Sequence, residues 1–207
     1  MRAIIFLTVA IILAVIFFVP PVKGLGELAK IIFFHIPTAW VAVIAFFTSA
    51  FYAAKFLRTQ DFLFDELSTR AAKLGFIFVI LATISGAIFS KLTWGAFWNW
   101  DPRQTTIFVL ILIYGAYLTL RAAVTNEKAR AKVSAVYSLL SVLTVPFLVF
   151  ILPRMYFSLH PAPILNSSGK LEMDAEILIV LLAAVADATL IFYSLLKLKN
   201  RADFIEH

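Results

Sequence analysis

The sequence contains no cysteine, and it has few charged residues for its length. Without cysteine the chain forms no disulfide, offers no thiolate to a metal and performs no thiol exchange of its own. Charged residues make up 14% of the 207 residues, whereas 62% are hydrophobic and the mean hydropathy is +0.96. Soluble domains contain about 25% charged residues, so the chain is predicted to lie in a lipid bilayer.

The net charge of +6 is not arranged as a nucleic-acid-binding surface. A nucleic-acid-binding protein gathers its Lys and Arg into one patch or stripe. Here the basic residues flank apolar runs, as they do in membrane proteins that face anionic lipid. Nucleic acid is therefore excluded as a partner, and the bilayer is expected to surround the chain.

Apolar runs of spanning length recur along the whole chain and leave no room for a separate soluble domain. The first run resembles a signal peptide, but no small-x-small cleavage site precedes Pro20, so it is interpreted as a retained span. The predicted fold is one all-α membrane domain over residues 1–207. Six transmembrane helices are predicted, each close to the ~20 residues that cross the hydrocarbon: residues 3–19, 37–57, 72–90, 102–123, 133–152 and 177–196.

The distribution of Lys and Arg predicts the orientation of these helices. The N-terminus, the second and fourth loops and the C-terminus together hold twelve basic residues, and the other three loops hold six. The richer side is predicted to be cytoplasmic. Both termini would then be cytoplasmic, and the first, third and fifth loops would lie outside.

The third loop concentrates aromatic residues, because Trp94, Trp98 and Trp100 are three of the four tryptophans in the chain. If this segment is a short interfacial helix, Trp94, Phe97, Trp98 and Asp101 share one face and form an aromatic shelf at the outer surface. The alternative is an interfacial aromatic belt. A belt places single rings at many helix ends, so the concentration in one loop favours a ligand-binding surface.

Two of the three histidines, His35 and His160, are predicted on the same outer side. Pro37 suits the first position of the second span, which leaves His35 just before that helix. Imidazole is a common ligand of iron, and residues distant in sequence can meet across a helical bundle. A single histidine near an interface is usually a bystander, and His207 is interpreted so, but a pair beside the tryptophan loop favours ligation.

Basic residues accompany these features, since Lys91 and Arg103 bracket the tryptophan loop and Arg154 precedes His160. Basic residues routinely end membrane helices, but they also pair with carboxylates. The combination predicts a flat, apolar ligand that bears carboxylates, namely haem. Its ring would lie on the aromatic shelf, His35 and His160 would be axial ligands, and the basic residues would meet the propionates.

Two acidic residues each leave alternatives open. Asp101 precedes Pro102, with Gln104 at the third helical position, and so suits an N-cap of the fourth span; it could equally belong to the haem site. Asp187 lies near the middle of the last span, where an acid is costly. It could be protonated and bonded to Thr83, Ser85 or Ser141, or it could relay protons.

The residues around these positions resemble the WWD family of haem-handling proteins. The stretch Trp94–Asp101 with residues 102–105 is similar to the family's tryptophan-rich signature. Residues 34–40 resemble its first histidine motif, and Leu159 and His160 resemble its second. With six spans, the chain resembles the CcmC type of the cytochrome c maturation apparatus. The Trp-Asp-Pro sequence also resembles the related synthetase-type haem proteins, which usually carry more spans and more histidines.

The resemblance implies a protein that is not an enzyme and that carries haem b as transient, non-covalent cargo. It would present haem at the outer face of a bacterial or archaeal cytoplasmic membrane to a membrane-anchored haem chaperone (CcmE-like). Transporter subunits with an ATP-binding cassette (CcmA/CcmB-like) and a small accessory subunit (CcmD-like) would be further partners. Beside the two histidines, the site would comprise Lys91, Trp94, Gly95, Phe97, Trp98, Trp100, Asp101, Arg103 and Arg154.

Other function classes remain open at this point. A haem or proton-coupled transporter would use Asp187 within the membrane. A synthetase that completes thioether attachment would need a docking surface for an apocytochrome, and the fifth loop, 153–176, is short for one. A purely structural subunit would tolerate alanine at His35 and His160.

Overall fold

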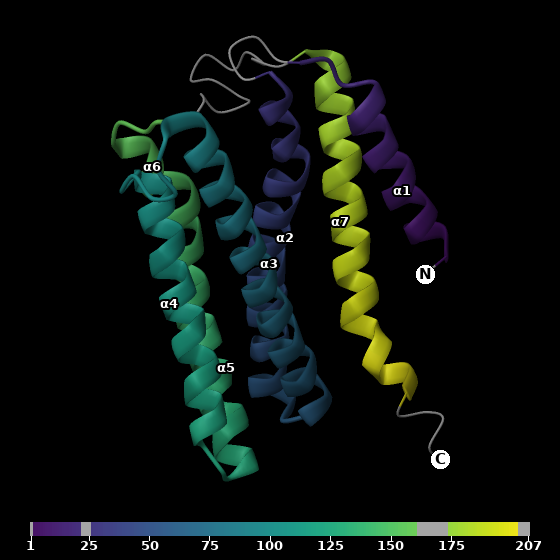
Figure 1. The fold of residues 1–207 in the computed structure, drawn as a ribbon. Helices are drawn as coiled ribbons and strands as arrows, with labels where there is room; N and C mark the ends of the chain where they lie inside the picture. The colour runs from purple at the N-terminus through teal and green to yellow at the C-terminus, as the bar shows by residue number, and fades with distance from the viewer. Residues whose placement is uncertain (1, 22–25, 161–173, 203–207) are drawn as a thin grey trace.

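The computed structural model of the chain is a bundle of helices that run up and down beside one another (Figure 1). It describes residues 2–21, 26–160 and 174–202, so the basic residues Lys23 and Lys170 and the predicted bystander His207 lie outside the described residues. No β-strand occurs in the described part, so the all-α prediction is confirmed. The elements are α1 (Arg2–Phe17), η1 (Glu27–Ile31), α2 (Ile32–Thr59), α3 (Phe62–Trp94), α4 (Pro102–Ala123), α5 (Glu127–Pro146), η2 (Phe147–Ile151), α6 (Leu152–Met155) and α7 (Ala175–Ala202).

Five helices in the described part are long and apolar enough to cross a membrane, and they correspond to the second to sixth predicted spans. α4 has the predicted bounds, whereas α3 is longer than its predicted span because it begins at Phe62 instead of Ala72. The turn before it is tight because Gln60 adopts a left-handed φ of 57° and the Asp61 carboxylate accepts a hydrogen bond from the Leu63 N–H at 2.9 Å. This N-cap starts α3 earlier than hydropathy indicates.

The first apolar helix is shorter than the others. Its apolar part, Ile4–Phe17, rises ~1.5 Å per residue and does not reach the ~30 Å of a hydrocarbon core. In Figure 1, α1 lies beside α7 over part of its length. The hydroxyl of Thr8 in α1 donates to Asp187 Oδ2 at 2.8 Å. The partner is therefore a threonine of a neighbouring helix, as expected, although it is not one of the three residues named above.

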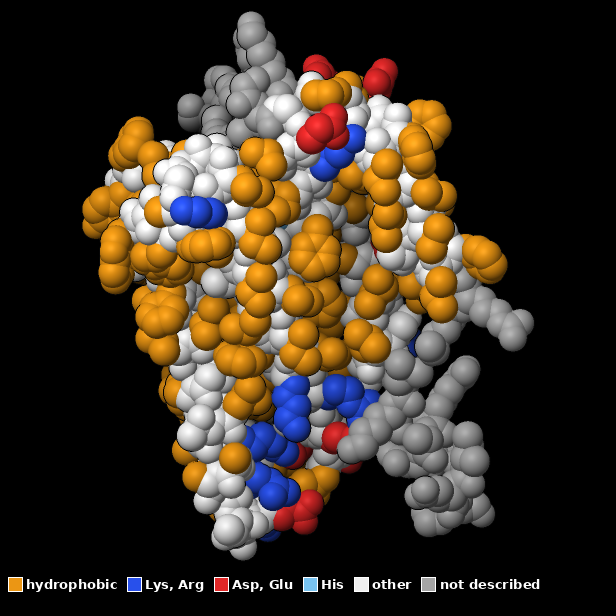
Figure 2. Space-filling model, in the orientation of Figure 1, with side chains coloured by type: hydrophobic (Ala, Val, Ile, Leu, Met, Phe, Trp, Pro, Cys, Tyr) orange, Lys and Arg blue, Asp and Glu red, His pale blue; other side chains and the backbone are white. Residues whose placement is uncertain are grey.

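The bundle is centred on α2, which packs against α3, α5 and α7. Phe46 of α2 is fully buried and stacks on Tyr114 with ring centroids 3.5 Å apart. A Cβ atom at Gly75 of α3 would lie 2.7 Å from the Phe46 ring, so glycine is needed for this close approach. Large apolar side chains cover much of the outside (Figure 2), as expected for a surface that lipid solvates.

The fifth predicted span, 133–152, contains Pro146, where the α-helix gives way to a π-helical turn. Pro146 ends α5, and the five residues of η2 that follow form a π-helical turn before α6. Proline cannot donate the hydrogen bond of an α-helix, and π-turns are one way in which a helix accommodates the loss. The α-helical hydrogen bonding of this span is therefore interrupted next to Pro146.

Charged residues gather at the end of the bundle opposite the histidines. Figure 2 shows Lys and Arg concentrated at the lower end. There Arg121 of α4 donates from Nη1 to Asp65 Oδ1 at 2.8 Å and from Nη2 to Oδ2 at 2.6 Å. The two side chains are 14% and 10% exposed, respectively. This bidentate pair joins α3 to α4, and Arg70 joins α3 to the Leu196 carbonyl of α7 at 2.7 Å.

Because the Asp65–Arg121 pair is largely buried, removal of one partner should be more harmful than removal of both. We expect Asp65→Leu or Arg121→Met alone to destabilise the protein by about 3–5 kcal/mol, since each leaves a buried charge without its counter-ion. The double variant should recover much of that loss. Thermal unfolding of the detergent-purified variants measures the effect, and a double variant as unstable as the two losses added together would contradict it.

Candidate functional site

The end of the bundle that is uppermost in Figure 1 collects three segments distant in sequence. They are the start of α2, the loop between α3 and α4, and the residues after α6. These segments carry His35, the tryptophan loop and His160, respectively. The predicted meeting of the third and fifth loops is therefore observed for the described residues.

His35 lies in the first turn of α2, which begins at Ile32, so the prediction that it precedes the helix was wrong. Pro37 lies inside the helix, because η1 leads directly into α2 and extends the helical path upstream. Next to the proline, the Thr38 hydroxyl lies 2.8 Å from the Phe34 carbonyl oxygen and 2.9 Å from the His35 carbonyl oxygen, and it donates to these two acceptors.

The ring of His35 is held against α3 by one edge. Its Nδ1 lies 2.9 Å from the Ala82 carbonyl oxygen and 3.1 Å from Ser85 Oγ. A carbonyl only accepts hydrogen bonds, so Nδ1 carries the proton and Nε2 keeps a free lone pair. A Cβ atom at Gly86 would lie 2.8 Å from His35 Cε1, so a glycine is required where the ring packs on α3.

Asp101 connects the loop between α3 and α4 to the segment that follows α6. Its Oδ1 accepts from the Arg103 N–H at 2.9 Å, which confirms the predicted N-cap of α4. Its Oδ2 accepts from Ser158 Oγ at 2.8 Å and from the Leu159 N–H at 2.7 Å. Burial raises the pKa of Asp101, but these hydrogen bonds and the nearby His160 outweigh it, so the pKa lies below its usual value.

His160 completes this junction, because its Nδ1 lies 3.0 Å from Asp101 Oδ1. The ionised carboxylate accepts, so Nδ1 again carries the proton and Nε2 is left free. Burial lowers the pKa of His160, and the positive charge of Arg103 lowers it further against the opposing effect of the Asp101 carboxylate. The ring is therefore neutral at neutral pH, and its edge packs on Trp94 with centroids 5.3 Å apart.

The tryptophan segment beyond Trp94 is a loop and not a short interfacial helix, so the aromatic face that we expected if it were helical does not form. Gly95 adopts a left-handed φ of 85° and ends α3 after Trp94. Beyond it the Asn99 side chain donates to Ser90 Oγ at 2.6 Å, and the Asn99 N–H donates to Gln104 Oε1 at 2.9 Å. Gln104 therefore fixes the loop instead of bonding the N-cap residue as a capping box would.

The aromatic residues of the loop divide into two groups. Trp94 contacts His160, whereas Trp98 packs edge-on against Trp100 and Phe108 at 5.9 Å each. Trp100 has a positive φ of 54°, which is uncommon for a residue other than glycine, and its side chain is 77% exposed. Phe97 is 59% exposed. These rings form an exposed aromatic rim beside the histidines.

The three predicted cationic residues differ in their availability. Lys91 bends back to the Gly95 carbonyl at 2.9 Å, and Arg154 donates to the Phe150 carbonyl at 2.6 Å. The guanidinium of Arg103 lies close enough to the Asp101 carboxylate and to Arg154 for their charges to interact. No carboxylate of the described residues lies within ion-pair distance of it. Arg103 is thus the cation best placed to meet an anionic group at the site.

Four residues that hold the histidines were missed by sequence reasoning. Ala82, Ser85 and Gly86 lie within an ordinary apolar span, and nothing in their local sequence indicates a distant histidine. Ser158 lies two residues before His160, where a short polar side chain is a usable signal for a local hydrogen bond.

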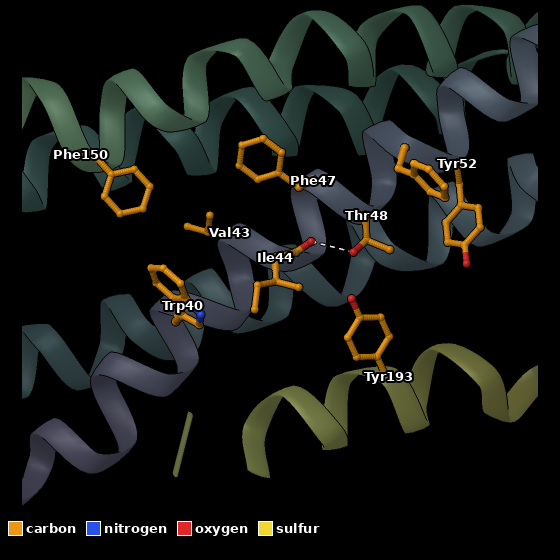
Figure 3. Close-up of a pocket in the computed structure, with 9 residues that line it drawn as sticks. Trp40, Val43, Ile44, Phe47, Thr48, Tyr52, Phe150 and Tyr193 are labelled. Carbon is orange, nitrogen blue, oxygen red and sulfur yellow. Dashed lines mark hydrogen bonds between the residues drawn. The ribbon is translucent and has the colours of Figure 1, made fainter. Parts of the chain in front are cut away.

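A separate apolar groove of about 600 Å³ runs along α2 between η2 and α7 (Figure 3). Its one dashed contact is the Thr48 hydroxyl donating to the Ile44 carbonyl at 2.8 Å. Neither a histidine nor a basic residue is among its lining residues, so the groove offers no imidazole to iron and no cation to a propionate. The lining residues are Trp40, Val43, Ile44, Phe47, Thr48, Phe51, Tyr52, Phe150 and Tyr193.

The sequence profile of the family described as CcmC, heme exporter protein C, matches residues 1–207. The chain belongs to this family. The heme exporter protein C of Bradyrhizobium diazoefficiens is 29% identical over 170 residues, which cover 82% of this chain and 64% of that relative. The protein of the same name from Rhodobacter capsulatus is 26% identical over 193 residues, which cover 90% of this chain and 77% of the relative.

A relative with a different name matches less of the chain. The cytochrome c biogenesis protein CcsA of Spinacia oleracea is 34% identical over 96 residues, which are 46% of this chain and 29% of that protein. The predicted resemblance to heme exporter protein C is therefore confirmed over the whole chain. The chain spans slightly less than two thirds of the length of the Bradyrhizobium relative.

The residues at this end of the bundle fit a haem better than a bare metal ion. Within the described residues, no three His, Asp or Glu side chains converge as a metal site. A porphyrin supplies four nitrogen ligands itself and needs only axial ones. Two neutral imidazoles with free Nε2 atoms, an adjacent indole and a nearby guanidinium meet that need.

Gly86 provides a test of how His35 is positioned. We expect Gly86→Ala to force the His35 ring away from the Ala82 carbonyl and to destabilise the protein by about 1–3 kcal/mol, as overpacking does. The matched variant is Gly115→Ala, where the nearest neighbour lies at 3.8 Å and a methyl group fits. It should be neutral or slightly stabilising, because alanine favours helix. Thermal unfolding compares the two, and equal behaviour would contradict the assignment.

Proposed function

We propose that this protein binds haem between His35 and His160 and presents it at the outer face of the membrane during c-type cytochrome biogenesis. One observation carries the proposal: each histidine has its Nδ1 bonded to an acceptor, at 2.9 Å for His35 and 3.0 Å for His160, and so offers Nε2. Residues that orient a ligating imidazole in this way are typical of metal sites. Membership of the heme exporter protein C family supports haem as the ligand.

Axial ligation by two histidines favours carriage of haem over catalysis. Six-coordinate iron has no open position for O₂ or a substrate, so the protein acts as a delivery component and not as an enzyme. The chain has no cysteine that could form a thioether with the porphyrin. The family resemblance implies that the cargo is haem b, held without a covalent bond. The protein's contribution is to bind, orient and release it.

The remaining site residues take roles that follow from their positions. Trp94, which packs on His160, covers one side of the bound ring. Arg103 meets the propionates, and Lys91 and Arg154 are weaker candidates because each is bonded to a backbone carbonyl. Phe97, Trp98 and Trp100 form the rim that a haem edge or an incoming protein contacts.

The basic end of the bundle supports the predicted topology. Positive residues favour the cytoplasmic side, so the histidine end faces the periplasm or exterior of a bacterial or archaeal cell. Together with the five long helices, α1 brings the number of membrane segments to six, and both termini are cytoplasmic. Its short apolar length is accommodated by local thinning of the bilayer or by its packing on α7.

The partners follow from the family. A membrane-anchored haem chaperone would receive haem at the aromatic rim. Transporter subunits with an ATP-binding cassette, together with a small accessory membrane subunit, would act on the loaded chaperone. Relatives named heme exporter protein C support participation in such an export system.

A second candidate function is a haem or proton-coupled transporter that uses Asp187. One observation favours it, because Asp187 is 5% exposed and its Oδ1 has no hydrogen-bond partner among the described residues. A delivery component needs no path through the membrane, so Asp187→Asn should spare haem loading. A transporter should lose it.

The proposed function is tested by absorption spectra of the detergent-purified protein. Wild type should show a Soret band with the α and β bands of low-spin haem. His35→Ala and His160→Ala should each weaken or shift these bands, because each removes an axial ligand, and His207→Ala is the control that should not. Absence of haem from wild type, or unchanged spectra in both variants, would overturn the proposal.

A further inference from the structure

We infer that the two axial ligands are unequal: Asp101 makes His160 the stronger, retained ligand, whereas His35 is the weaker ligand that leaves first when haem is handed on. This inference rests on the haem site proposed above. It assigns Asp101 as a positioning residue that acts through His160, and it assigns an order to the breaking of the two iron–nitrogen bonds.

The acceptor behind His160 is a charged group. The Asp101 side chain is completely buried, and its Oδ1 lies 3.0 Å from His160 Nδ1. Hydrogen bonds to an ionised acceptor are roughly twice as strong as those between neutral groups. A carboxylate that pulls on the Nδ1 proton gives the imidazole more negative character, which makes Nε2 a stronger donor to iron.

Three further donors keep that carboxylate in place. The Arg103 N–H, the Ser158 hydroxyl and the Leu159 N–H all bond to it within 2.9 Å. A carboxylate has about four lone-pair positions, so the three bonds leave one for His160. The same bonds fix the segment that carries His160, although that segment is not helical.

The acceptors behind His35 are neutral and shared. The Ala82 carbonyl, 2.9 Å from His35 Nδ1, also accepts from the Ser85 hydroxyl at 3.0 Å. Ser85 Oγ is the second partner at 3.1 Å. Neutral acceptors polarise the Nδ1–H bond less than a carboxylate does, so His35 is the weaker donor to iron. A receiving protein with its own nitrogen ligand would therefore replace His35 while His160 still holds the iron.

Carbon monoxide is a suitable probe, because it replaces one axial ligand of ferrous haem and its stretching frequency reports on the ligand that remains opposite. We expect the carbon monoxide adduct of wild type to match that of His35→Gly and to differ from that of His160→Gly. Transfer of haem to apomyoglobin should be about 10-fold slower from His35→Gly than from His160→Gly, the lower end of the usual effect of such supporting groups.

Asp101→Asn separates the effect of charge from the loss of a helix cap. Asp61 is the matched control, because its Oδ1 caps α3 through the Leu63 N–H at 2.9 Å just as Asp101 caps α4. Asparagine caps helices as well as aspartate does. Asp101→Asn should accelerate haem loss about 10-fold, shift the carbon monoxide frequency and raise the midpoint potential, and Asp61→Asn should change none of these.

The outcomes distinguish this inference from the proposed function. Equal rates of haem loss from the two glycine variants, or a wild-type adduct that matches His160→Gly, would overturn the inequality and leave bis-histidine ligation intact. Asp101→Asn that behaves like Asp61→Asn would also overturn it, even if a glycine variant failed to fold. Unchanged low-spin spectra in both glycine variants would instead overturn the haem site itself.

Discussion

The carboxylate of Asp101 is the interaction on which the arrangement of this end of the bundle depends. It starts α4, accepts two hydrogen bonds from the segment that follows α6, and holds the ring of His160. A buried carboxylate is costly unless its lone pairs are satisfied, and here donors from two separate loops satisfy it together. The same carboxylate therefore caps a helix and joins two loops that are distant in sequence. The predicted N-cap role of Asp101 is confirmed, and its place in a haem site stays a prediction.

The rest of the bundle supports this junction from a distance. The Phe46–Tyr114 stack and the close approach at Gly75 hold α2, α3 and α4 together in the core. The Asp65–Arg121 pair fixes the opposite end of α3 and α4. Helices anchored at both ends keep the Ala82 carbonyl facing His35. Polar contacts thus lie chiefly where loops and helix ends meet, while the surface between them is apolar, as a lipid environment requires.

Much of the fold follows from hydropathy, and much of the site does not. The five long spans and the Asp101 cap were predictable because apolar length and capping are local properties. The tryptophan loop has no helical face, because Gly95 ends α3 in a left-handed conformation. His35 lies inside α2 and not before it, because η1 leads into α2 and starts the helical path upstream of Pro37. Ser85 and Gly86 could not be identified, since their role depends on how α2 packs on α3.

The central claim is that one haem iron lies between the Nε2 atoms of His35 and His160, and a cryo-electron-microscopy map of the haem-loaded protein tests it most directly. The account predicts iron density joined to both Nε2 atoms, with His160 Nδ1 still bonded to Asp101 and His35 Nδ1 still bonded to Ala82. Haem density in the apolar groove beside Trp40, or ligation through only one or neither of these histidines, would contradict it.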